Sequence, residues 1–210
     1  MAYIHKTPGW LKRLYPSLTW DYSDRPEKRI YLTFDDGPIP EVTEFVLETL
    51  DHYEAKATFF CVGDNIMKHQ DIARHISGQG HTIGNHTHNH IKGWNTANTA
   101  YYENIGQCEK AIEEVGITSR RLFRPPYGRI GTRQIRQLRE EYDIVMWDVL
   151  TGDYNASLRP RSILKHVSAA TRPGSIVLFH DSIKAHPRMK VVLPAYLKHF
   201  SNQGYTFSSL

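Results

Sequence analysis

The sequence has 210 residues, of which 40% are hydrophobic and 23% charged, a composition that indicates one soluble domain and excludes disordered, collagen-like and disulfide-scaffold proteins. The formal net charge is only +4, and Lys and Arg are scattered along the chain, so the composition gives no support to nucleic-acid binding. Cys61 and Cys108 lack the paired spacing of a thiolate metal site and are expected to be buried thiols.

The first 28 residues match no repeat and place Trp10, Tyr15, Trp20 and Tyr22 among basic residues. We expect a segment packed over the bottom of the main fold, with a weak interfacial membrane contact as the alternative. No apolar stretch approaches the ~20 residues of a membrane helix, and no run resembles that of a signal peptide. The compartment is therefore expected to be the cytoplasm as the chain is written, or the cell envelope or exterior if a leader was removed.

From residue 30 onward, short apolar runs alternate with longer stretches of helical periodicity. The first pair is a strand at residues 30–34 and a helix from residue 40 to about residue 52, where Pro40 suits the first helical turn. Further strands are predicted at residues 58–62, 82–84, 122–124, 144–149, 175–180 and 205–208. Further helices are predicted at residues 66–76, 101–115, 134–138, 163–170 and 191–200.

This alternation predicts an α/β protein with a mainly parallel sheet. Residues 176–179 are apolar without alternation, which is typical of a strand covered on both faces. The first strand is followed by Asp35 and Asp36 rather than by the glycine-rich loop of a dinucleotide fold, which favours a barrel over an open doubly wound sheet. We therefore predict a small barrel of about seven parallel strands in a single domain.

Polar residues gather where the predicted strands end, which is the face of a barrel that carries the active site. The clusters are Asp35-Asp36, the segment from His86 to His90, Arg124 with Tyr127, Asp148 with Asp153, and His180-Asp181. Two adjacent carboxylates after an apolar strand are costly to bury unless a cation lies beside them. The alternative without a functional role is a solvated turn, since Asp-Asp-Gly-Pro is a common turn sequence.

The histidine segment favours a metal ion as that cation. His86 and His90 stand four apart and would share one face of a helical turn, whereas in a strand all three imidazoles, His88 included, would share a face. The spacing alone therefore leaves the two ligands unidentified. One Asp and two His suit Zn²⁺ or a similar ion with open coordination positions, which is typical of a catalytic site.

Arg124 and His180 are weaker signals when each is taken alone. Arg124 precedes a stiff proline pair and Gly128, a loop able to aim a backbone N–H, but an Arg after a strand is ordinarily a surface residue. On that basis, replacing Arg124 by Ala is expected to lower activity and spare the fold. His180 closes an apolar strand, so it is either a core histidine or, beside Asp181, a candidate acid.

Together these segments resemble the polysaccharide deacetylases, the NodB-homology family, also known as carbohydrate esterase family four. The family motifs Thr-Phe-Asp-Asp-Gly, His-(Ser/Thr)-x-x-His, Arg-x-Pro-x-Gly, Asp-x-x-Asp-Trp and Leu-x-His stand here in order at residues 33–37, 86–90, 124–128, 150–154 and 178–180. The likeness covers about residues 30–210. It implies a distorted (β/α) barrel, with residues 29–210 as the catalytic domain and residues 1–28 as an N-terminal segment packed on it.

The resemblance also implies a metal site and a base. Asp36, His86 and His90 would hold one divalent metal ion, with zinc as the expected ion, and this resolves the histidine ambiguity against His88. Asp35 would be the catalytic base, and Arg124 would pair with its carboxylate and orient it.

The remaining implied roles concern the leaving group and the oxyanion. His180 would be the general acid, held and tuned by Asp153, and the backbone N–H of Tyr127 would complete an oxyanion hole. Thr87 would brace the histidine loop. The fourth motif departs from the family pattern, because Leu150 takes the place of its first Asp and Tyr154 the place of Trp, and nothing shows that Asp148 substitutes. Tyr154 would reshape a sugar subsite while keeping an aromatic wall.

The implied function is that of a metal-dependent hydrolase that removes N-acetyl groups from N-acetylglucosamine units of a chitooligosaccharide or peptidoglycan and releases acetate. The alternatives are an O-acetyl esterase of acetylated xylan and a non-catalytic glycan-binding protein. The expected partner is an acetylated glycan, with no nucleic acid, no membrane span and a monomeric state.

Overall fold

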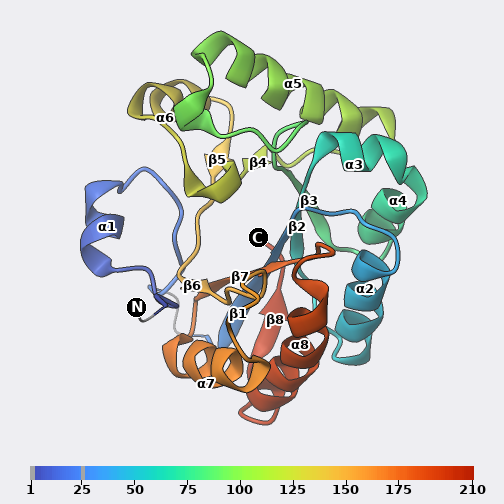
Figure 1. The fold of residues 1–210 in the computed structure, drawn as a ribbon, viewed down its shortest axis with the longest axis vertical. Coiled ribbons are helices and arrows are strands. Elements are labelled where there is room, and N and C mark those ends of the chain that lie inside the picture. The colour runs from blue at the N-terminus through green and yellow to red at the C-terminus, as the bar shows by residue number, and fades with distance from the viewer. Residues whose placement is uncertain (1–2, 25–26) are drawn as a thin grey trace.

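The computed structural model describes residues 3–24 and 27–210 (Figure 1). Its strands are β1 (Arg29–Asp35), β2 (Thr58–Cys61), β3 (Thr82–Asn85), β4 (Leu122–Phe123), β5 (Asp143–Ile144), β6 (Val149–Leu150), β7 (Ile176–His180) and β8 (Thr206–Ser208). Its α-helices are α1 (Gly9–Leu14), α2 (Val42–His52), α3 (Gly63–Lys68), α4 (Gln70–Gly78), α5 (Asn98–Glu114), α6 (Thr132–Leu138), α7 (Pro160–Ala170) and α8 (His186–Ser201). Two 3₁₀ turns are η1 (Gly93–Asn95) and η2 (Pro126–Gly128).

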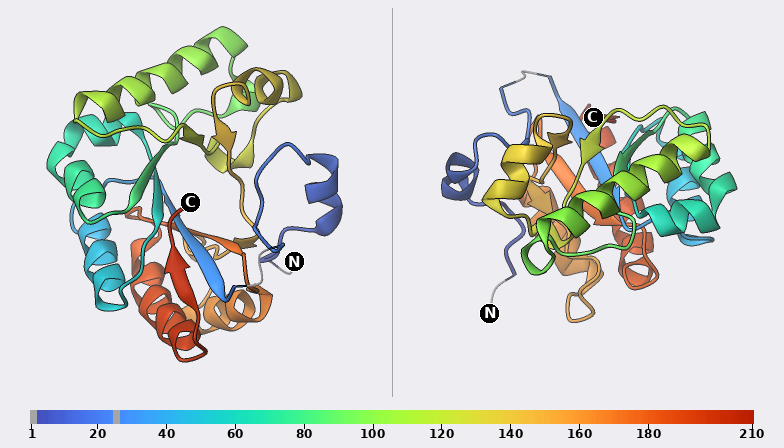
Figure 2. Two further views of the ribbon diagram at one scale, coloured as in Figure 1. Left: turned by 180° about the vertical axis from the view of Figure 1, so that it is seen from behind. Right: turned by 90° about the horizontal axis from the view of Figure 1, so that it is seen from above.

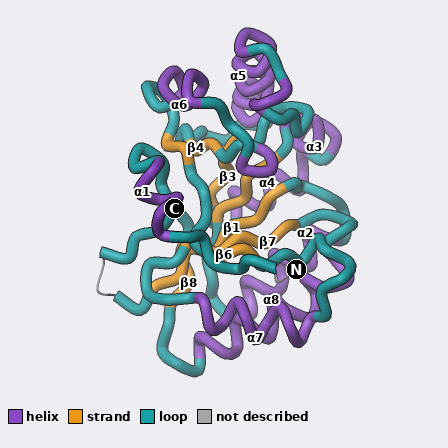
Figure 3. Tube along the Cα trace, turned by 60° about the vertical axis from the view of Figure 1, so that its left-hand side comes forward, coloured by secondary structure: helices purple, strands orange, loops and turns teal. Residues whose placement is uncertain are grey.

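The strands form one curled parallel sheet in the order β5-β4-β3-β2-β1-β7-β6, with β8 pairing β1 outside this path. Helices α2 to α8 surround the outside of the sheet, as Figures 1 and 2 show from three directions. Figure 3 shows the same arrangement from the side, with the strands at the centre. The predicted α/β fold, a single-domain barrel-like sheet of about seven parallel strands, is confirmed, in the form of a curled half-barrel.

Strand β1 lies in the middle of the sheet, and this position explains its composition. All of its residues except Arg29 are buried, because β2 and β7 flank it and helices cover it. Ile30, Leu32 and Phe34 belong to the main hydrophobic core, together with residues of α2 and α8. Asp35 pairs in register with Phe60 of β2 and with His180 of β7, so the end of β1 is brought beside the end of β7.

Two predicted elements are each divided in the structure. The expected strand at residues 144–149 is two short strands, β5 and β6, which lie at opposite ends of the sheet path. The expected helix at residues 66–76 is two helices, because His69 leaves helical geometry at φ −131° and ends α3 before α4 begins. Apolar periodicity continues through both breaks, so the pattern alone does not reveal them.

The N-terminal segment bridges the two ends of the curled sheet, as Figure 1 shows beside β5 and β6. The N–H of Thr19 donates to the carbonyl of Ile144 at 2.9 Å, and the N–H of Met146 donates back to Thr19 at 2.7 Å. On the other side, the N–H of Leu150 in β6 donates to the carbonyl of His5 at 2.9 Å. The segment thus supplies hydrogen bonds that neither end strand obtains from the other.

Asp148 anchors this segment through its buried carboxylate. Lys6 approaches its Oδ2 at 2.5 Å, Lys12 forms an ion pair with its Oδ1, and the Ser175 hydroxyl donates to Oδ2 at 2.6 Å. The role of Asp148, which the sequence leaves open, is therefore to hold the N-terminal segment on the barrel. The division into residues 1–28 and 29–210 stays a prediction, and residues 1, 2, 25 and 26 lie outside the described residues.

Among the residues that the structure describes, no helix combines the length and the apolar character needed to cross a membrane.

Candidate active site

The carboxylate of Asp35 lies at the end of β1 and is held by a buried arginine. Arg124 Nη1 donates to Asp35 Oδ1 at 2.8 Å and to the hydroxyl of Thr33 at 2.8 Å. Thr33 precedes Asp35 by two residues in the strand, so both side chains lie on the same face of the sheet. The other oxygen of Asp35 lies 3.6 Å from His86 Nε2. Asp35 therefore has one oxygen bound to Arg124 and one directed to the histidines.

Arg124 is fully buried, which the sequence does not indicate. Its Nε donates to the carbonyl of Val145 at 3.2 Å, its Nη2 donates to the carbonyl of Met146 at 2.8 Å, and its guanidinium lies 4.1 Å from the centre of the Phe60 ring. The expectation of a surface arginine is wrong, and we no longer expect its loss to spare the fold. Its removal leaves a buried carboxylate and two carbonyls without their donor.

Asp36 follows in a left-handed conformation, with φ 91°. Burial favours a raised pKa for Asp36, but the hydrogen bond from His90 and the nearby His180 hold the pKa below its usual range. The next peptide is fixed by Asp181, whose Oδ1 accepts from the N–H of Gly37 at 3.0 Å. A Cβ at position 37 would lie 1.9 Å from the Asp181 carboxylate, so only glycine fits there.

His86 is oriented by its backbone partner. Its Nδ1 lies 2.7 Å from the carbonyl of Arg124, and because a carbonyl only accepts, Nδ1 carries the hydrogen. Nε2 is left with a lone pair that faces the two carboxylates. Burial lowers the pKa of His86 to about 4, so the ring is neutral at pH 7, which is the form that binds metal ions.

His90 completes a cluster of three potential metal ligands. Its Nε2 lies 3.3 Å from Asp36 Oδ1, and its ring is 5.0 Å from the His86 ring. One donor atom from each of Asp36, His86 and His90 lies within 4.8 Å of the others. His88 is not part of this group, because its ring packs against Gly63 so closely that a Cβ there would lie 2.5 Å from Nδ1.

The histidine loop is braced from two sides. The hydroxyl of Thr87, a residue with φ 63°, accepts from the N–H of Ile91 at 3.2 Å, as expected for a residue that braces this loop. Asn104 of α5 accepts from the N–H groups of His88 and Asn89 at 2.9 and 3.0 Å. These bonds satisfy backbone groups of a loop that has no regular secondary structure.

His180 at the end of β7 forms the second charged pair of the site. Its Nδ1 donates to Asp153 Oδ1 at 2.8 Å, and its backbone N–H donates to Asp153 Oδ2 at 2.9 Å. Burial works against protonation, but Asp153 and then Asp36 and Asp35 raise the pKa of His180 to about 9. The imidazole is therefore protonated at pH 7 and has Nε2 available for proton transfer.

Tyr154 stands beside this pair, where the family has Trp. Its ring meets the His180 ring edge-on at 4.8 Å, and its hydroxyl lies 2.7 Å from the hydroxyl of Tyr3 in the N-terminal segment. A Cβ on Gly152 would lie 2.6 Å from the Tyr3 ring, so a glycine with φ 69° is needed next to Asp153. The N-terminal segment thus supports one wall of the site.

Tyr127 belongs to the 3₁₀ turn η2 and has a left-handed backbone, with φ 61° and ψ 9°. Its ring lies 4.7 Å from the ring of His90. Gly128 follows with φ 65°, and a Cβ there would lie 2.7 Å from Trp147, so close packing fixes this turn. The backbone of the turn and the ring of Tyr127 are therefore held next to the metal-ligand cluster.

Three residues that help to form the site were given no role from the sequence. Thr33 is detectable in principle, because strand alternation places it on the face of Asp35. Asp181 was noted only as a neighbour of His180, and its partners Gly37 and Thr43 become evident only in the fold, where Thr43 Oγ1 donates to Asp181 at 2.6 Å. Asn104 lies in the middle of a helical pattern, and no local signal marks it.

Comparison with known proteins agrees with this geometry. The family model described as polysaccharide deacetylase matches residues 22–147. The chain is 34% identical over 200 residues to a peptidoglycan-N-acetylglucosamine deacetylase of Bacillus cereus, with 93% of each chain covered. It is 37% identical over 158 residues to a chitooligosaccharide deacetylase of Azorhizobium caulinodans, with 74% of each chain covered. A solved peptidoglycan N-acetylglucosamine deacetylase superposes with a TM-score of 0.88 at 29% identity, covering 97% of this chain and 95% of that one.

Proposed function

Because the chain belongs to the polysaccharide deacetylase family, we propose that it is a metal-dependent hydrolase that removes the acetyl group from N-acetylglucosamine units of a glycan. The observation that carries the proposal is the placement of two charged pairs, Arg124–Asp35 and His180–Asp153, on paired strands β1 and β7 beside a cluster of metal ligands. Residues 29–210 form the catalytic domain in this proposal, and the active species is a monomer.

The donor set fits a divalent metal ion, which the family uses. Asp36 offers a carboxylate oxygen, and His86 offers a neutral Nε2 whose orientation is set by the bond from Nδ1 to a carbonyl. Oxygen and imidazole ligands of this kind suit zinc, which we propose as the ion. When bound, the ion supplies Lewis acidity towards water and the acetamide carbonyl.

Asp35 acts as the general base in this mechanism. Its free oxygen faces the histidines and takes the proton from the attacking water, while its other oxygen stays bound to Arg124. Arg124 cannot give up its proton at physiological pH, so it orients Asp35 without competing for the transferred proton. The tetrahedral oxyanion accepts a hydrogen bond from the backbone N–H of Tyr127.

His180 acts as the general acid. An amide nitrogen leaves only after it gains a proton, and the protonated His180 supplies one from Nε2 while Nδ1 stays bound to Asp153. The products are a free amine and acetate. Tyr154 stands edge-on to His180, and we assign it to the wall that contacts the sugar next to the acetyl group.

The test is acetate release by protein loaded with zinc. The substrates are N-acetylated chitooligosaccharides, peptidoglycan fragments and acetylated xylan, and the controls are protein treated with a chelator and the Asp35→Asn variant. We expect acetate and free amines from at least one of the first two substrates, with both controls releasing far less. Turnover of acetylated xylan alone would replace the N-deacetylase assignment with an O-acetyl esterase.

A further inference from the structure

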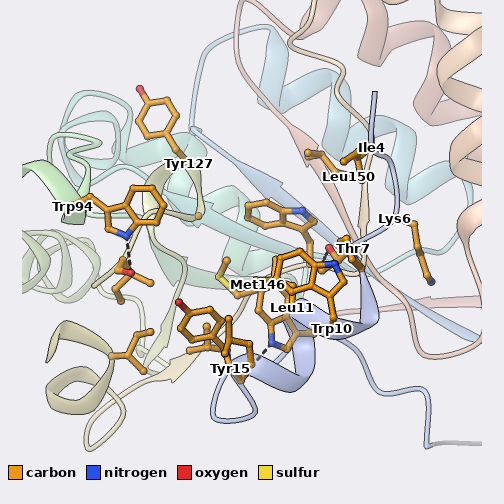
Figure 4. Close-up of a pocket in the computed structure, with 18 residues that line it drawn as sticks. Ile4, Lys6, Thr7, Trp10, Leu11, Tyr15, Trp94, Tyr127, Met146 and Leu150 are labelled. Carbon is orange, nitrogen blue, oxygen red and sulfur yellow. Dashed lines mark hydrogen bonds between the residues drawn. The ribbon is translucent and has the colours of Figure 1, made fainter. Parts of the chain in front are cut away.

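A cavity of about 440 Å³ lies beside the metal-ligand cluster, between the N-terminal segment and the loops of the barrel (Figure 4). In Figure 4, Trp10 and Leu11 of α1 face Trp94 and Tyr127 across the cavity, and Met146 lies between them. The volume is within the range of about 300 to 1,000 Å³ that is usual for small-molecule sites. None of the roles assigned above uses the N-terminal side of this cavity.

The aromatic rings around the cavity are unusually open to solvent. Trp10 is 66% exposed, Trp94 is 64% exposed and Tyr127 is 57% exposed. A contiguous exposed apolar surface of this kind marks a binding site more often than an ordinary surface. The three rings come from three separate segments, so no single helix periodicity explains their convergence.

Each wall of the cavity is held in place before any ligand binds. Trp94 Nε1 donates to the carbonyl of Ile130 at 2.8 Å, which fixes the indole. On the other wall, Thr7 donates from its N–H to the carbonyl of Asp148 at 2.8 Å and from its hydroxyl to the carbonyl of Trp147 at 2.7 Å. Binding to a preorganised site does not have to order these residues.

The cavity adjoins the metal-ligand cluster through the ring of Tyr127. Tyr127 lines the cavity, and its ring also contacts the ring of His90 at 4.7 Å. Leu150 lines it as well and lies three residues before Asp153 in the fourth motif. A glycan with one unit at the metal-ligand cluster therefore has this cavity within reach of its next units.

We propose that the cavity binds further pyranose rings of the glycan against its aromatic walls, Trp94 on one side and Trp10 on the other, an inference that rests on the proposed function. A pyranose presents an apolar C–H face, which packs on aromatic rings, and an edge of hydroxyl and amide groups. Lys92 lies 4.6 Å from the centre of the Tyr127 ring and Arg129 lies 5.6 Å from the centre of the Trp94 ring. These cations lie against two of the lining rings and supply hydrogen-bond donors near the cavity, which suits a sugar better than an alkyl chain or a second copy of this protein.

The first experiment measures binding without turnover. Calorimetry with zinc-loaded Asp35→Asn protein and N-acetylated chitotetraose is repeated with Trp10→Ala or Trp94→Ala added, and with Val191→Ala, an exposed apolar residue of α8, as the matched control. Loss of an aromatic anchor is expected to weaken binding about 10-fold in each Trp variant. The control is expected to bind normally, and thermal melting verifies that each variant is folded.

The second experiment measures acetate release against chain length in otherwise unmodified protein. We expect kcat/KM to rise from the disaccharide to the tetrasaccharide, and we expect this gain to shrink about 10-fold in Trp10→Ala and Trp94→Ala. Unchanged chitotetraose binding in both Trp variants overturns the proposal. So does a dimer in light scattering that Trp10→Ala dissolves, or a naphthalene dye that binds the cavity and is not displaced by chitotetraose. Absence of acetate from every glycan refutes the proposed function, while calorimetry still decides on the cavity.

Discussion

The two sides of the active site both pair a carboxylate with a cation, but they use different cations. On the β1 side, Asp35 is bound to Arg124, which makes four hydrogen bonds, two to side chains of β1 and two to the carbonyls of the adjacent residues Val145 and Met146. On the β7 side, Asp153 is bound to His180, whose pKa is raised to about 9. The arginine keeps its proton throughout, whereas the imidazole can release and regain one.

This difference separates positioning from proton transfer. On the β1 side, Arg124 keeps its proton, so Asp35 is the group that gains and loses a proton in the reaction. On the β7 side, Asp153 stays bound to Nδ1 of His180, so His180 is the group that transfers a proton. A base and an acid are thus maintained at the same pH by opposite partners. Substitutions on the two sides are therefore expected to change activity, stability and pH dependence in different ways.

The metal-ligand cluster that both sides share gives the largest expected effect. His86→Ala and His90→Ala each remove a ligand and are expected to lose the metal ion and nearly all activity, while His88→Ala keeps both because its ring packs against Gly63. Metal content of the purified variants, measured by mass spectrometry, is the test. Loss of metal from His88→Ala with retention in His90→Ala would show the ligand set to be wrong.

Asp35→Asn tests the base alone. The amide keeps the size of the side chain and an oxygen for Arg124 but cannot take a proton, so turnover is expected to fall at least ~10²-fold, the low end for a positioned acid or base. The metal content is expected to remain. Turnover near that of the unmodified protein would contradict the assignment of Asp35.

Arg124→Ala is expected to impair the fold as well as the activity. It leaves the buried Asp35 carboxylate unpaired, and breaking a buried ion pair in this way costs about 3 to 5 kcal/mol of unfolding free energy. Urea unfolding followed by circular dichroism measures the change. Arg136→Ala on the exposed face of α6 is the matched control, with an expected change within about 0.5 kcal/mol.

Asp153→Asn is expected to move the pH dependence. The charge of Asp153 raises the pKa of His180, and His180 is expected to set the alkaline limb of the activity profile. Without the Asp153 charge the pKa of His180 falls, and the limb moves to lower pH. An alkaline limb that stays in place in the variant would show that another group limits the reaction.

The same pair makes stability depend on pH. Because the folded pKa of His180 lies above its ordinary value of 6.5, the stabilisation is complete below about pH 6.5 and is lost as the pH rises towards 9. Urea unfolding at pH 6 and pH 9.5 is expected to show this loss in the unmodified protein. The loss is expected to be smaller in Asp153→Asn.

The smallest expected effect belongs to Tyr154, which contacts the β7 pair without being part of it. Tyr154→Trp restores the residue type of the family motif and enlarges the wall beside His180. We expect a change of a few-fold in preference between chitooligosaccharides and peptidoglycan fragments, with metal content unchanged. Identical preference in the two proteins would remove Tyr154 from the substrate wall.

The sequence predicted the strands and helices that show a local apolar pattern. The parallel sheet and the convergence of strand ends follow from apolar runs that each bury a strand, and the order of five motifs identified the family. The burial of Arg124 could not be predicted from the sequence. The carbonyls of Val145 and Met146 accept its hydrogen bonds, and nothing in the residues around Arg124 indicates these partners. Such partners are 21 and 22 residues away in the chain.

The contacts by which the N-terminal segment packs on the barrel were not predicted, for the same reason. Its hydrogen bonds to β5 and β6 are made by single residues, such as Thr19 and His5, so no strand-like run announces them. Likewise, Trp10 has no apolar periodicity around it that indicates a cavity wall, because the opposite wall is supplied by Trp94. Contacts between segments far apart in sequence depend on the whole fold.

The bridge that joins β5 and β6 through the N-terminal segment has a consequence for synthesis of the chain on the ribosome. Lys6 and its partner Asp148 are separated by 142 residues. At about 5 to 20 residues per second, the segment waits roughly 7 to 30 s before its partner is made. During that interval the backbone groups of His5 and Thr19 lack the partners that β5 and β6 will supply, and this nascent chain is the stage at which a chaperone has most to protect.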